Sequence, residues 1–159
     1  MDNSKIKIFV DCHVFNNGFQ GTRTYIQGLY QELAKDENIL FYFAANDIEN
    51  LESVFGAKKN IKFLKYTFKN KFLRLLLNIP YLIINNKIDF AHFQYIVPPI
   101  KFCKYIVTTH DVLFIDYPKY FSFLSRIKNT FLYKKGAKSA KIRLTVSEYS
   151  KNKIAQHFN

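Results

Sequence analysis

A threonine, a histidine and an aspartate stand in a row at positions 109–111, and His110 and Asp111 are the chain's best candidates for chemistry. They follow residues 105–108 (YIVT), whose β-branched and aromatic side chains are typical of a buried parallel strand. Ligands of open α/β sheets bind just past the carboxyl ends of the strands. A histidine there can donate, accept or carry a proton near neutral pH. We therefore take His110 as the candidate catalytic residue and Asp111 as a candidate substrate-binding residue. Taken alone, His110 is better explained as a loop histidine that only hydrogen-bonds backbone, and it is the rest of the chain that favours a functional role.

Other loops that follow predicted strands carry further candidate substrate-binding residues. Gly18 and Gly21 would let backbone N–H groups approach a phosphate at a helix N-terminus. Arg23, in the first turn of that helix, could grip phosphate or carboxylate with two hydrogen bonds. Tyr95 lies after the fourth strand, and Ser147 after the sixth. The alternatives are a tight turn for the glycines, a solvated surface arginine for Arg23, and a helix cap for Ser147.

Strand and helix patterns alternate along the chain and must position these residues. This alternation predicts an α/β fold, namely a Rossmann-like, doubly wound, mainly parallel sheet with helices on both faces. Strands are expected at 5–11, 39–45, 61–66, 89–93, 105–108 and 142–146. Helices are expected after Gly21, at 48–55, 71–87 and 120–138, and after Ser147. No domain boundary is visible, so residues 1–159 are expected to form a single domain.

Two of the predicted helices carry specific expectations. The helix at 71–87 contains Pro80, which should lie inside it or kink it. The helix at 120–138 should turn its apolar residues inward and its lysines outward. The residues expected on its inner face are Leu124, Ile127, Phe131 and Leu132.

The amino-acid composition limits which classes of protein and of binding partner fit this chain. A content of 48% hydrophobic and 18% aromatic residues excludes a mainly disordered chain. The net charge of +12 favours an anionic partner: a phosphate-bearing ligand, an anionic membrane surface or nucleic acid. Two cysteines, Cys12 and Cys103, are too few for a disulfide scaffold and indicate a reducing compartment. Neither has metal-ligand spacing to other candidate ligands, so no metal is expected.

No signal peptide or membrane span is expected, so the predicted location is cytoplasmic. The first residues run directly into a strand, and the longest apolar segment, 72–84, is too short to cross a bilayer. The charged residues within 58–87 are all basic. A basic amphipathic helix of this kind could attach peripherally to anionic lipid at the inner face of the membrane. It equally fits a solvated basic face over an ordinary core helix.

Several nucleotide-binding and hydrolase motifs are excluded by spacing. The dinucleotide fingerprint G-x-G-x-x-G requires three glycines directly after the first strand, whereas Gly18 and Gly21 come late and the first glycine is missing. This disfavours an NAD-type oxidoreductase. The sequence also contains neither G-x-x-x-x-G-K-[ST] nor G-x-S-x-G.

Four stretches, in order, resemble motifs of the family 4 retaining glycosyltransferases, which have the two-domain GT-B architecture. Residues 18–29 resemble the glycine-rich first loop and following helix, and residues 89–95 are similar to the D-x-x-H strand. Residues 107–118 resemble the T-x-H-D strand and loop, and residues 144–150 the V-S-x-x-S strand. The resemblance covers nearly the whole chain and corresponds to the N-terminal half of such an enzyme.

The resemblance implies a function and roles for individual residues. Gly18 and Gly21 would approach the donor diphosphate or the transferred sugar, although the first loop lacks the family's Gly-Gly pair. His110 would contact the transferred sugar and orient the reacting centre. The expected donor is a nucleotide-diphosphate sugar, and the acceptor a sugar or lipid-linked sugar in polysaccharide or glycolipid synthesis. The family's donor-binding domain, with its E-x7-E carboxylates, is missing here, so this acceptor-side half is expected to hold no cofactor and to be inactive alone.

A second hypothesis is a non-enzymatic Rossmann-like module whose basic face binds nucleic acid or an acidic partner. Aromatic residues interleaved with lysine at Phe68, Lys69 and Phe72 permit this. The sequence has no recognised RNA- or DNA-binding signature, so nucleic acid is not the expected partner.

Overall fold

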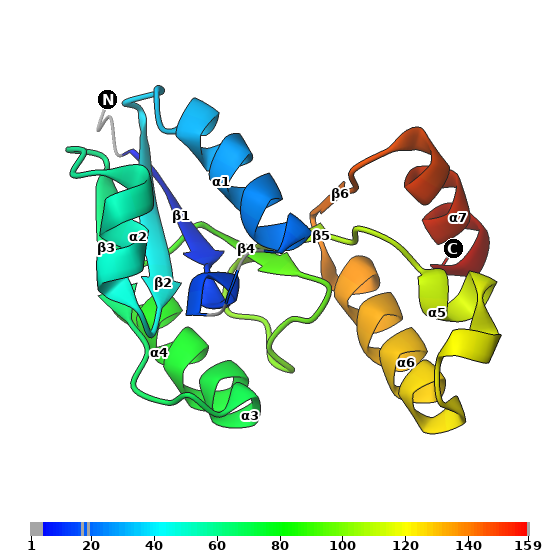
Figure 1. The fold of residues 1–159 in the computed structure, drawn as a ribbon. Helices are drawn as coiled ribbons and strands as arrows, with labels where there is room; N and C mark the ends of the chain where they lie inside the picture. Colours follow the sequence, from blue (N-terminus) through cyan, green and yellow to red (C-terminus); the bar gives the residue numbers. More distant parts are fainter. Residues whose placement is uncertain (1–4, 17, 19, 159) are drawn as a thin grey trace. The chain divides into compact units, whose positions relative to one another are not determined.

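The computed structural model describes residues 5–16, 18 and 20–158, and it confirms the predicted α/β, Rossmann-like class. Its strands are all parallel and follow the order β3-β2-β1-β4-β5-β6 (Figure 1). The strands are β1 (Ile6–Asp11), β2 (Ile39–Ala45), β3 (Ile61–Lys65), β4 (Phe90–Gln94), β5 (Lys104–Thr108) and β6 (Ile142–Leu144). The α-helices are α1 (Gly21–Leu33), α2 (Ile48–Phe55), α3 (Lys71–Leu73), α4 (Ile79–Asn85), α5 (Leu113–Asp116), α6 (Phe123–Ser139) and α7 (Glu148–Phe158). The 3-10 helices are η1 (His13–Asn16) and η3 (Pro118–Tyr120), and η2 (Arg74–Asn78) is a π-helix.

The chain forms two compact units. The first unit comprises the described residues up to His92 together with Pro98–Lys104. It holds β1, β2, β3 and β4 up to His92. The second unit comprises Phe93–Val97 and the residues from Tyr105 onward, so it holds the end of β4, β5 and β6.

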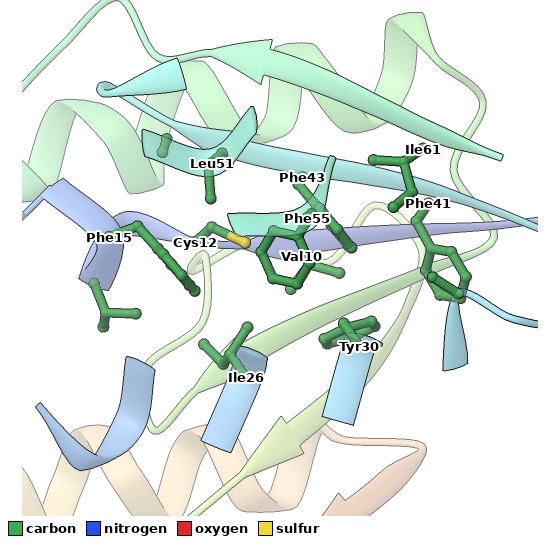
Figure 2. Packing of buried hydrophobic residues seen from close by; sticks show 13 residues of the cluster. Val10, Cys12, Phe15, Ile26, Tyr30, Phe41, Phe43, Leu51, Phe55 and Ile61 are labelled. Carbon is green, nitrogen blue, oxygen red and sulfur yellow. The ribbon is translucent and has the colours of Figure 1, made fainter. Parts of the chain in front are cut away.

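The core of the first unit forms on one side of its strands (Figure 2). Alternate residues of β2, such as Phe41 and Phe43, face this core because side chains alternate along a strand. Tyr30 of α1 packs edge-on against both rings, with centroids 5.5 Å apart in each case. The other fully enclosed members come from β1, η1, α1 and α2, and include Val10, Cys12, Ile26 and Leu51. Both cysteines of the chain are free thiols.

The opposite side of β1 carries a buried carboxylate. Asp11 is only 2% exposed and alternates with the core residues Val10 and Cys12. Its side chain meets Tyr66, which directly follows β3, and Arg74 of η2. The segment after β3 therefore covers this second side of the strands.

The expected helix at 71–87 is built from three pieces, α3, η2 and α4. Pro80 lies in the first turn of α4, where its missing N–H costs least. The preceding π-helix, Arg74–Asn78, changes the hydrogen-bond register just before the proline. The segment thus stays helical through Pro80 by widening one turn rather than by simply kinking.

The second unit is packed around a close approach between helix α6 and the end of β4. Gly136 of α6 is buried, and a Cβ atom at this position would collide with the backbone oxygen of Tyr95. Tyr95 itself has a positive φ of 61°, which is uncommon for an aromatic residue. A small buried cluster surrounds this contact, with Phe114, Ala137 and Phe158 among its members.

The prediction that α6 turns Leu124, Ile127 and Phe131 inward is wrong. Their exposed fractions are 77%, 53% and 66%. Helix α6 begins at Phe123, capped by Ser122, and packs through its C-terminal half, where Tyr133 and Ala137 meet the buried cluster. The N-terminal half of the helix therefore leaves its apolar side chains in solvent, while Leu132 is half-buried.

We expect Gly136→Ala to lower the free energy of unfolding by about 1–3 kcal/mol, because the new methyl group overpacks a contact with backbone. Gly28→Ala is the matched control. Gly28 lies exposed inside α1 with nothing within 4 Å of an added Cβ, so the same substitution should stabilise by about 0.5–1 kcal/mol. Urea denaturation of both variants would measure the two changes. A neutral or stabilising Gly136→Ala would contradict the close approach.

Candidate functional site

The side chains after β4 and β5 form a hydrogen-bonded aromatic cluster in the second unit. His110 Nε2 lies 2.8 Å from the amide oxygen of Gln94, the last residue of β4. The hydroxyl of Tyr95 donates to Asp111 Oδ2 at 3.1 Å. The Tyr95 ring lies 5.3 Å from the His110 ring and stacks on Tyr133 at 4.4 Å. His110, Tyr95 and Asp111, all predicted from the sequence, are therefore neighbours.

Backbone hydrogen bonds fix the positions of these residues. The N–H of Tyr95 donates to Thr108 O at 2.9 Å, and that of Thr109 donates to Leu144 O at 3.0 Å. These bonds continue the strand pairing beyond the strand ends. Asp111 Oδ1 accepts from Leu113 N at 3.1 Å, which turns the chain into α5. Asp111 thus holds Tyr95 with one oxygen and the start of α5 with the other.

Burial favours the neutral form of the histidine in this cluster. Burial lowers the pKa of His110, although the charge of Asp111 opposes the change. Burial and the charge of Asp111 raise the pKa of Tyr95, and they raise that of Tyr133 as well. With the amide oxygen of Gln94 as acceptor, His110 Nε2 carries the proton, so the basic lone pair is on Nδ1. A neutral imidazole and two phenols can bind or orient hydroxyl groups, and the imidazole can also move a proton.

Ser147 is a helix cap, which is the alternative to substrate binding that the sequence left open. Its Oγ accepts from the backbone N–H of Ser150 at 3.1 Å, which is the geometry of a helix N-cap on α7. The two hydroxyl oxygens also lie 3.1 Å apart. Ser147 therefore stabilises the start of α7.

The remaining predicted residues, Gly18, Gly21 and Arg23, belong to the first unit. Gly21 is the first residue of α1, and both glycines are exposed with no atom within 4 Å of an added Cβ. Arg23 donates to Asn50 Oδ1 at 3.0 Å and lies 5.0 Å from the centre of the Phe15 ring. It thereby links α1 to α2 and η1. Phe19, between the two glycines, lies outside the described residues.

The sequence analysis missed a second polar centre, around Asp11 in the first unit. Tyr66 donates to Asp11 Oδ1 at 2.9 Å, and His13 Nδ1 and Arg74 Nη2 lie 3.1 and 3.7 Å from Oδ2. Burial would raise the pKa of Asp11, but the charges of His13 and Arg74 and the hydrogen bonds from His13 and Tyr66 hold it well below its usual range. The available signal was Arg74 itself, a lone charge within the apolar run 72–77.

Neither polar centre has the composition of a metal site. Within residues 5–16, 18 and 20–158, no group of three or more His, Cys, Asp or Glu side chains is arranged to hold a metal ion. Over the same residues, no helix combines the length and apolarity needed to cross a membrane.

Acidification should lower the free energy of unfolding because His110 becomes protonated more readily in the unfolded chain. Its folded-state pKa lies below the ordinary value of 6.5, so the unfolded chain takes up a proton first as the pH falls. The contribution of His110 is thus fully present above pH 6.5 and is lost as the pH falls toward the folded-state pKa. Between pH 7.5 and 5.5, wild type should lose more unfolding free energy than His110→Gln. An NMR titration midpoint for His110 at or above 6.5 would contradict this.

No protein-family model matches this chain, and a search of curated proteins finds no significant match. Family membership is therefore not established by similarity. The function proposed below is supported by the sequence motifs and by the geometry around His110.

Proposed function

We propose that this chain is the acceptor-binding domain of a nucleotide-sugar-dependent glycosyltransferase in polysaccharide or glycolipid synthesis. The observation that carries the proposal is His110, a neutral histidine at the carboxyl end of a parallel strand, hydrogen-bonded to Gln94 and packed beside Tyr95. Sugars present hydroxyl groups and apolar ring faces. A neutral imidazole and an amide suit the hydroxyls, and an aromatic ring suits the faces.

The proposal gives each neighbouring residue a role. His110 hydrogen-bonds the transferred sugar and orients it for attack by the acceptor hydroxyl. Asp111 keeps Tyr95 in place through its hydroxyl, and Tyr95 in turn packs against the imidazole ring. Gly18 and Gly21 belong to the first unit, and for them the family resemblance alone suggests a role toward the donor diphosphate. Transfer also needs a donor-binding domain that holds the nucleotide-diphosphate sugar, so this chain alone should bind an acceptor without turning it over.

A surface in the first unit supports a lipid-linked acceptor at the cytoplasmic face of a membrane. The segment α3-η2-α4 exposes large apolar side chains, with Phe72 at 72% and Tyr81 at 62%. Leu73, Leu76, Leu77 and Ile84 are also exposed. Lys69, Lys71 and Lys87 are exposed near its two ends. Exposed apolar side chains with flanking lysines are the features of a segment that lies on anionic lipid.

Loss of His110 should abolish most sugar transfer. In an enzyme that joins this domain to its donor-binding domain, His110→Ala should lower kcat by about 100-fold or more, because the sugar loses a group that orients it. The assay follows transfer from a panel of labelled nucleotide sugars to membrane lipids and oligosaccharides. His157→Ala is the matched control, since that histidine belongs to the same unit but bonds Asp116. Equal activity of the two variants would contradict the role of His110.

Membrane attachment should depend on the exposed aromatic residues of the first unit. The double variant Phe72→Ser, Tyr81→Ser should bind vesicles with 30% phosphatidylserine about tenfold more weakly than wild type, because two apolar anchors are lost. Tyr120→Ser is the control, since Tyr120 is equally exposed at 72% but lies in the second unit. Vesicle sedimentation measures binding. Equal losses in both variants, or equal binding to uncharged vesicles, would argue against attachment by this segment.

A further inference from the structure

A polar cavity of about 780 Å³ lies in the first unit, where the segments after β1, β2 and β3 meet. None of the site residues predicted from the sequence lines it. Its volume falls in the range of small-molecule sites. The charged or titratable residues of its lining are His13, Asp47, Glu49, Lys65, Lys69 and Arg74.

Arg74 is the most deeply buried cation of this cavity. Its side chain is 7% exposed, and its Nη2 lies 3.7 Å from Asp11 Oδ2, which is longer than a hydrogen bond. Its Nε–H has no hydrogen-bond partner in the described part of the chain. Leaving a buried charged donor unsatisfied is costly. Arg74 also lines the cavity, so the part of its guanidinium that faces the cavity can meet an anionic group of a ligand.

The buried carboxylate of Asp11 contacts two residues of the cavity lining, His13 and Arg74. The carboxylate is fixed by the hydroxyl of Tyr66 and by the backbone N–H of His13, at 2.9 and 3.2 Å. It therefore holds the His13 ring and the Arg74 guanidinium on one side of a single buried charge. Since Asp11 stays ionised well below neutral pH, it keeps a negative charge beside His13 and Arg74, both of which line the cavity. Arg74 also lies over the Tyr66 ring, 5.6 Å from its centre.

The rim adds exposed charges of both signs. Lys65 and Lys69 are exposed, and neither has a side-chain partner among the described residues. Asp47 uses one carboxylate oxygen to cap α2, accepting from Asn50 N at 3.0 Å. Glu49 is exposed two residues further along, in the first turn of α2. The lysines and Arg74 can share a phosphate dianion, while the two carboxylates can accept hydrogen bonds from hydroxyl groups.

We propose that this cavity binds a small phosphate ester of a hydroxyl-rich compound. Arg74, Lys65 and Lys69 hold the phosphate, and Asp47 and Glu49 accept from the hydroxyls. Every residue involved belongs to the first unit, so the proposal does not depend on the role of His110. A phosphate group presents more acceptor oxygens than a carboxylate does, so three side chains can share it, which favours the phosphate ester.

The test is a titration of the folded chain with glucose 6-phosphate at constant ionic strength, followed by calorimetry or NMR. Saturable binding is expected, and the double variant Lys65→Gln, Lys69→Gln should weaken it by roughly tenfold or more. The matched control is Lys58→Gln, Lys59→Gln, which removes the same charge from exposed residues outside the cavity lining. The control should bind as wild type does. If the Arg74→Gln variant folds, it should no longer bind the ester. If it does not fold, the comparison of the two lysine pairs is the test of the proposal.

Three results would overturn the proposal. Absence of saturable binding at millimolar glucose 6-phosphate would do so directly. Equal weakening in the two lysine pairs would mean that the ester only senses the net charge of +12. Binding of unphosphorylated glucose with equal affinity would mean that the phosphate is not recognised. Inorganic phosphate should bind more weakly than the ester, since it makes no contact with the rim carboxylates, and an equal affinity would remove their proposed role.

Discussion

The polar side of the first unit depends on one buried carboxylate. Asp11 ends β1 with its side chain turned away from the apolar core, where an unpaired charge would be costly. Three segments supply partners for this carboxylate: η1 through His13, the end of β3 through Tyr66, and η2 through Arg74. Buried ion pairs contribute little net stability, because desolvation offsets their attraction. Their consequence here is positional, since one charge fixes where the His13 ring and the Arg74 guanidinium lie.

In the second unit the corresponding constraint is steric. Gly136 lets α6 approach the backbone of Tyr95 closely enough that no other residue would fit. The same approach holds Tyr95 at a φ that costs about 1–2 kcal/mol for an ordinary side chain. In this conformation the Tyr95 ring contacts the rings of both Tyr133 and His110. The cluster around His110 is therefore positioned by packing, whereas that around Asp11 is positioned by charge.

Local sequence signals predicted the elements well. The run at 39–45 and the helix at 48–55, which ends at Gly56 with its φ of 69°, have the predicted bounds. His110, Tyr95 and Asp111 could be grouped because parallel strands place their ends together. The outer face of α6 could not be predicted, because periodicity identifies an apolar face but not whether the chain covers it. The Asp11–Arg74 contact links residues far apart in sequence, and it depends on a π-helix that no residue pattern announces.

The two polar centres differ in charge in a way that suits them to different ligand groups. Around His110, burial suppresses ionisation, so the available interactions are hydrogen bonds and ring contacts of the kind that hydroxyl groups and sugar faces make. Around Arg74, the buried carboxylate of Asp11 stays ionised and lies beside the guanidinium that lines the cavity. A phosphate placed beside His110 would meet no fixed cation of that cluster and would be repelled by Asp111. An apolar ring face in the Arg74 cavity would leave the guanidinium unsatisfied. Each environment therefore selects against the ligand group that the other favours.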